Sequence, residues 1–112
     1  MKISKTNSEH YQWGHKCDAW HLLNTESLSI IRESMPPGSE EILHSHHKAQ
    51  QFFYILSGSA TFEIEGETIE VTSDEGFYVK PNKKHKIKNT GASPLHLLVI
   101  SEPKAHGDRV NV

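Results

Sequence analysis

The stretch EILHSHHKAQQFFYILSG, residues 41–58, contains two strand-like segments and decides the fold predicted for this chain. The first segment spans 41–46. The second, 50–58, is rich in aromatic and large apolar residues and ends at a glycine, a residue that often marks a turn. Just before the stretch, the two prolines of MPPGS (35–39) exclude a central strand, because proline has no backbone N–H to donate.

The faces of these two segments separate the candidate ligands. Side chains two positions apart on a strand point to the same side of a sheet. His44 and His46 therefore lie side by side, whereas His47 points to the opposite face and is expected at the surface. In the second segment, Gln51 and Phe53 share one face.

Short strand-like segments recur on both sides of this stretch. The clearest is 59–72, where Phe62 and Ile64 alternate with polar residues before a glycine-centred turn, and Ile69 and Val71 do so after it. This pattern predicts a β-hairpin with one solvated face. The other segments are 19–24, 28–34, 76–80, 85–89 and 95–101. Roughly nine short strands without crossover helices predict an all-β fold, an antiparallel jelly-roll barrel.

Composition limits the function classes. The chain has 112 residues, which fits one domain, and a formal net charge of -2, which argues against nucleic acid as the main partner. No apolar run approaches the ~20 residues that a membrane span requires. A single cysteine, Cys17, and the absence of an apolar leader at the N-terminus predict a reducing, cytoplasmic location.

Nine histidines stand out in the composition, and only some have informative spacing. His85 opens the segment 85–89 and is a third candidate ligand beside His44 and His46. His96 shares a face of the last long strand with Leu98, so it either enters a cavity or is an ordinary structural histidine. Those without partner spacing are expected to be structural or exposed: His10, His15, His21 and His106.

The spacing of one segment resembles a family motif. The segment Gly38-x5-His44-x-His46-x4-Gln51-x6-Gly58 is similar to the first cupin motif, G-x5-H-x-H-x3–4-E-x6-G. Glutamine stands where the motif has glutamate.

The second cupin motif, G-x5-P-x-G-x2-H-x3-N, is present in a degraded form. His85 and Asn89 match it, while Asp74, Lys80 and Asn82 take the places of its first glycine, its proline and its second glycine. The resemblance implies a cupin-type double-stranded β-helix, with residues 1–112 as one domain and 1–18 as an N-terminal arm or strand. Motif 1 covers about 38–58 and motif 2 about 74–89.

The resemblance also implies a metal site formed by His44, His46, His85 and Gln51. A neutral amide leaves the full charge of a divalent ion in place, so such a site is expected to hold Zn, Ni, Mn or Fe more weakly than a carboxylate version would. Gln50 is an alternative ligand, but strand alternation and the spacing to Gly58 favour Gln51. The predicted pocket residues are Phe53, Phe62, Phe77 and His96, although core packing is the default explanation for aromatic residues.

Three functions are compatible with the predicted fold and metal site. The first is a divalent-metal-dependent enzyme of the dioxygenase, isomerase or lyase type, acting on a small organic metabolite. The second is a non-catalytic cupin that binds a sugar or other metabolite beside a vestigial or regulatory metal site. The third is a structural barrel that acts through dimerisation. An outward apolar strip of Phe52, Tyr54 and Leu56 predicts a homodimer in every case.

Overall fold

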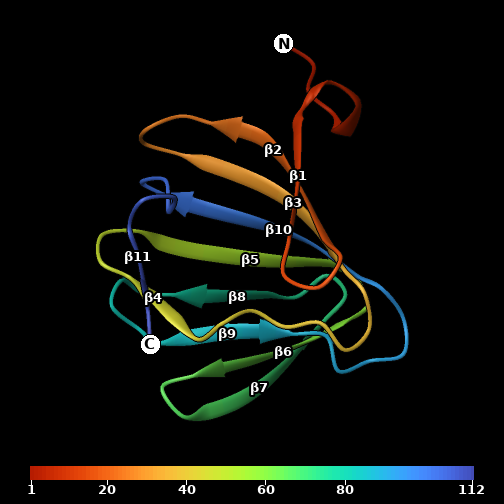
Figure 1. Cartoon of the computed structure of the whole chain (residues 1–112), viewed down its shortest axis with the longest axis vertical. Coiled ribbons are helices and arrows are strands. Elements are labelled where there is room, and N and C mark those ends of the chain that lie inside the picture. The colour runs from red at the N-terminus through yellow and green to blue at the C-terminus, as the bar shows by residue number, and fades with distance from the viewer.

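Eleven strands form two antiparallel sheets that face each other (Figure 1). This computed structural model describes residues 1–112. The only helical element is a 3₁₀ turn, η1, at Lys5–Asn7, and no helix has the length and apolar character to cross a membrane. The six-stranded sheet is formed, in spatial order, by β1 (Glu9–Trp13), β2 (Cys17–Asn24), β3 (Ser29–Met35), β10 (Leu95–Glu102), β5 (Gln50–Ser57) and β8 (Gly76–Val79). The five-stranded sheet is formed by β11 (Arg109–Asn111), β4 (His44–His46), β9 (His85–Lys88), β6 (Ser59–Ile64) and β7 (Glu67–Thr72).

The predicted all-β architecture is confirmed, with differences at its edges. Two strands go beyond the predicted set: β1, within the N-terminal segment, and β11, whose sequence Arg-Val-Asn is too short and polar to give a periodic signal. β4 is shorter than predicted, because before His44 the pairing with β9 is reduced to an isolated bridge between Glu40 and Lys88.

Period-two burial places the core between the sheets. In β10, which pairs with both β3 and β5, the side chains of Leu95, Leu97, Val99 and Ser101 are buried and the residues between them face outward. The largest buried apolar side chains come from both sheets and include Phe53, Ile55, Phe62, Met35 and Ile87. Burial of one face of each sheet is the main stabilising contribution in this arrangement.

All four glycine positions of the two motifs have positive φ angles. Gly38 and Gly58 have φ of 84° and 92°, and a Cβ atom on Gly58 would lie 2.8 Å from the carbonyl oxygen of Pro94. Asp74 and Asn82, which replace glycine in motif 2, have φ of 66° and 68°. Asp and Asn tolerate this left-handed conformation better than other side chains, so the degraded motif keeps its backbone geometry.

Candidate metal centre

Three histidines converge on two neighbouring strands of the five-stranded sheet. His44 and His46 come from β4, and His85 begins β9, directly opposite His44 in the antiparallel register. One ring nitrogen of each lies within 4.8 Å of those of the other two. All three residues are at most 6% exposed. Imidazoles gathered in this way form a donor set suited to a transition metal ion.

Backbone carbonyl groups orient two of the imidazoles. Nδ1 of His44 donates to the carbonyl oxygen of Ile42 at 2.7 Å, and Nδ1 of His85 donates to that of Lys83 at 2.8 Å. Because Nδ1 carries the proton, Nε2 of each ring keeps its lone pair for a ligand. Hydrogen bonds of this kind fix the tautomer and ring orientation of metal-binding histidines.

Gln51 turns its carbonyl oxygen toward the histidines. Its side-chain nitrogen donates to Oγ of Ser101 at 3.0 Å, which leaves Oε1 3.2 Å from Nε2 of His85. With the His85 proton on Nδ1, these two atoms are both lone-pair donors. A shared cation accounts for their proximity, so the residues present fit a divalent metal ion.

Burial keeps the imidazoles neutral. Desolvation lowers the pKa of His44 to about 3 and that of His46 to about 4, and it also lowers the pKa of His85. The guanidinium of Arg109 adds to the decrease for all three histidines, and repulsion from neighbouring histidines adds to it for His44 and His46. Near pH 7 a metal ion therefore does not have to displace protons from these ligands.

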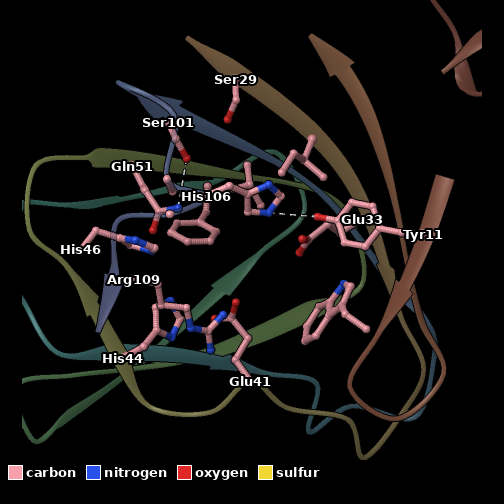
Figure 2. Close-up of a pocket in the computed structure, with 16 residues that line it drawn as sticks. Tyr11, Ser29, Glu33, Glu41, His44, His46, Gln51, Ser101, His106 and Arg109 are labelled. Atoms are coloured by element: carbon pink, nitrogen blue, oxygen red, sulfur yellow. Dashed lines mark hydrogen bonds between the residues drawn. The ribbon is translucent and has the colours of Figure 1, made fainter. Parts of the chain in front are cut away.

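A cavity of about 280 Å³ opens beside the histidines (Figure 2). His44, His46 and Gln51 lie at one end, and Tyr11 and Glu33 lie at the other. The strands β1, β3, β4, β5 and β10 and the C-terminal segment around 105–109 supply its walls.

Two carboxyl groups that line the cavity, those of Glu33 and Glu41, were not predicted from the sequence. Burial raises the pKa of Glu33 to about 8 and that of Glu41 to about 7; repulsion from Glu41 adds to the rise for Glu33, and Arg109 opposes both. Glu33 did leave a signal, since it is in phase with the inward residues Ile31 and Met35 of β3. Arg109 left none, because it reaches the cavity through the pairing of β11 with β4.

The predicted pocket residues are only partly at the cavity. Phe53 lines it, whereas Phe62 and Phe77 stack on each other behind Phe53, with ring centroids 4.6 Å apart, and belong to the core. His96 requires a correction: it lies on the outer face of β10, because the inward positions are taken by Leu95 and Leu97.

The remaining histidines have separate roles. His47, which follows the last residue of β4, is exposed, as expected. His10 pairs with Asp18 at 2.8 Å. His106, expected to be structural or exposed, lines the cavity although it is exposed, and its Nε2 lies 3.5 Å from the hydroxyl of Tyr11.

Comparisons with known proteins are consistent with this geometry. The model of the family described as "Cupin domain" matches residues 31–101. An uncharacterized protein of Methanocaldococcus jannaschii is 35% identical over 75 residues, covering 67% of this chain and 60% of the relative. The oxalate-binding protein of Thermotoga maritima is 29% identical over 85 residues, covering 71% of this chain and 70% of the relative.

Solved structures show the same fold. A predicted oxalate decarboxylase from Thermotoga maritima superposes with a TM-score of 0.85 at 22% identity, over 93% of this chain and 100% of that chain. The relatives are often longer than this chain. The match spans 60% of the Methanocaldococcus protein and 20% of a putative mannose-1-phosphate guanylyltransferase from Vibrio cholerae.

Proposed function

The chain belongs to the cupin family, and we propose that it is a divalent-metal-dependent enzyme acting on a small organic acid. The observation that carries the proposal is the convergence of His44, His46 and His85 with the oxygen of Gln51, beside a cavity that His44, His46 and Gln51 line. When bound, a divalent ion polarises a substrate oxygen and stabilises negative charge that develops on it.

The charge of the site supports an anionic substrate. Neither the imidazoles nor Gln51 neutralises a divalent ion, and Arg109 adds a further positive charge at the cavity. One relative, from Thermotoga maritima, is an oxalate-binding protein, which is consistent with a small carboxylate ligand here. The cavity volume of about 280 Å³ lies at the small end of the range of ligand pockets, roughly 300–1,000 Å³, which suits a compact metabolite.

Acid–base groups favour catalysis over binding alone. Glu33 and Glu41 have pKa values near neutrality, so proton donors or acceptors are available within the cavity. The second candidate is a non-catalytic metabolite-binding cupin. The specific observation for it is Gln51, an amide that cannot act as a base beside the ion.

The test begins with metal content. The protein is purified, reconstituted separately with Zn²⁺, Ni²⁺, Mn²⁺ and anaerobic Fe²⁺, and analysed by elemental analysis. Each form is then incubated with a panel of small hydroxy, oxo and dicarboxylic acids, followed by NMR and an oxygen electrode. Metal-dependent turnover supports the enzyme. Binding without turnover supports the second candidate. Ligand affinity that is equal with and without metal contradicts the enzyme and is the result expected of a binding protein with a vestigial metal site.

We further propose a cytoplasmic homodimer. Phe52 of β5 and Tyr78 of β8 are paired on the outer face of the six-stranded sheet and are 40% and 48% exposed. Apolar strips of this kind are often buried between subunits. Analytical ultracentrifugation of the wild type and of Phe52→Glu tests the dimer, since the charge is expected to shift the equilibrium toward monomer. The cytoplasmic location rests on the single cysteine, Cys17, because a chain with one cysteine has no internal disulfide that an oxidising compartment would maintain.

A further inference from the structure

Glu33 is a buried carboxyl group for which the protein provides no partner. The residue is 8% exposed, it forms no ion pair, and neither of its side-chain oxygens accepts a hydrogen bond from the protein. The oxygens are not sealed in the core but open to the cavity, so their hydrogen bonding has to be completed by a molecule in the cavity. A ligand that completes the hydrogen bonding is one such molecule.

The neighbours of Glu33 in the sheet explain why it lacks a partner. Its register partners on the two flanking strands are Ala19 and Leu97, both fully buried and apolar. Along its own strand, the next inward residues are Ile31 and Met35. The one direction left to the carboxyl group is the cavity, into which Figure 2 shows it pointing, at the end remote from His46 and Gln51.

The titratable groups that act on Glu33 come from four other parts of the chain. They are Tyr11 of β1, Cys17 of β2, Glu41 before β4 and Arg109 of β11. Desolvation is the largest influence on Glu33 and keeps its carboxyl group protonated at neutral pH. A protonated carboxyl group donates a hydrogen bond.

We propose that Glu33 is a ligand-binding residue that donates a hydrogen bond to the end of the ligand farthest from the histidines. This inference rests on the proposed function, because it places one end of the ligand at the metal centre. It narrows the substrate class to organic acids that carry an oxygen acceptor, such as a second carboxylate or a carbonyl group, at the end opposite to the metal-bound group.

Glu41, the second carboxyl group of the cavity, does have a hydrogen-bond partner in the protein. Its Oε1 accepts a hydrogen bond from the backbone N–H of Ile87 at 3.1 Å, so this carboxyl group is partly satisfied by the protein. Glu33 has no comparable contact. The two carboxyl groups therefore differ in role, and only Glu33 is left free for the ligand.

The experiment compares matched acids by calorimetry on the Zn²⁺-loaded protein. Malonate, succinate and glutarate are each compared with the monocarboxylate of the same carbon number: propionate, butyrate and valerate. Two variants separate hydrogen-bond donation from ionisation. Glu33→Gln keeps a hydrogen-bond donor but cannot ionise, and Glu33→Leu can neither donate a hydrogen bond nor ionise. Zinc content and thermal unfolding are measured for every protein first.

At pH 6.5 the wild type is expected to bind at least one dicarboxylate more tightly than the monocarboxylate of the same carbon number. In Glu33→Leu the ratio of these two affinities is expected to fall about tenfold. Between pH 6.5 and 9 the preference of the wild type decreases as Glu33 ionises, whereas that of Glu33→Gln persists. A preference unchanged in Glu33→Leu overturns the inference. So does a Glu33→Gln protein whose pH profile follows the wild type, a comparison that remains available if the leucine variant does not fold.

Failure of the proposed function has a different signature. In that case the wild type takes up no zinc, or binds none of the monocarboxylates in a zinc-dependent manner. A zinc-dependent monocarboxylate complex without any contribution from Glu33 leaves the metal site in place and overturns this inference alone.

Discussion

His44 and His85 face each other across the pairing of β4 with β9, with ring centroids 4.4 Å apart. Each donates its Nδ1 proton to the backbone carbonyl two residues before it. The same local contact therefore prepares Nε2 on two strands that are 41 positions apart in the chain. These two matching hydrogen bonds orient Nε2 of both histidines toward the metal site.

Replacing two of the ligands is expected to abolish metal binding. His44→Ala combined with His46→Ala leaves His85 and Gln51, which are too few donors to retain an ion through purification. Elemental analysis measures the loss, and circular dichroism checks that the β-fold remains. The matched control is His47→Ala, which replaces an exposed histidine just after β4 and should keep wild-type metal content. Undiminished metal in the double variant would contradict the assignment.

Gln51→Glu is expected to raise metal affinity by about tenfold, because a carboxylate replaces an amide oxygen that already points toward the site. Competition with a chelator measures the affinity. Gln50→Glu is the control, since Gln50 points away from the site and bonds to Glu102 and Tyr78. An unchanged affinity in Gln51→Glu would place Gln51 outside the ligand set.

The metal-free protein is expected to become less stable as the pH falls below 6.5, because folding lowers the pKa values of its buried histidines. The pKa of His44 is about 3 and that of His46 about 4, against 6.5 for an ordinary histidine. Between these values the unfolded chain binds more protons, so each histidine lowers the free energy of unfolding by up to about 1.4 kcal/mol per pH unit as the pH falls. Urea unfolding at pH 6.5 and 4.5 should show a shallower decrease in the His44→Ala/His46→Ala protein. Equal slopes would contradict the burial of neutral imidazoles.

Glu33 is expected to change the pH dependence of stability in the opposite direction to the histidines. Its pKa rises from 4.5 to about 8 on folding, so the folded state holds an extra proton between these values and stability falls as the pH increases. Glu33→Gln removes this effect. Relative to the wild type, the free energy of unfolding of the variant should rise by up to about 1.4 kcal/mol per pH unit from pH 4.5 to 8. Denaturant unfolding at pH 5 and pH 8 measures the gain, and a difference that is the same at both values counts against a protonated Glu33.

The left-handed residue Asn82 provides a test of the turn beside the site. Its backbone N–H donates to the carbonyl oxygen of His46 at 2.7 Å, and its φ is 68°. Asn82→Gly should fold with equal or greater stability, whereas Asn82→Val should lose roughly 1–2 kcal/mol, because a β-branched side chain is strained at positive φ. Thermal unfolding distinguishes the two. Equal stability of both variants would show that this backbone conformation is not maintained.

Local alternation was enough to predict much of this protein. Period-two patterns identified nine of the strands, separated the buried His44 and His46 from the exposed His47, and put Gln51 with Phe53 rather than with Gln50. The same pattern misled at His96, where both faces of β10 carry large apolar residues and alternation alone does not say which face is buried.

Only the tertiary structure decided what surrounds the metal ligands. The carboxyl group of Glu33 and the guanidinium of Arg109 reach one cavity through β3 and β11, which lie in different sheets. The side-chain period along a strand is a local property of the backbone, so the sequence alone determines which residues share a face. The choice of partner strands depends on how two whole sheets bury their apolar faces together. That long-range packing determined which polar groups meet beside His44, His46 and His85.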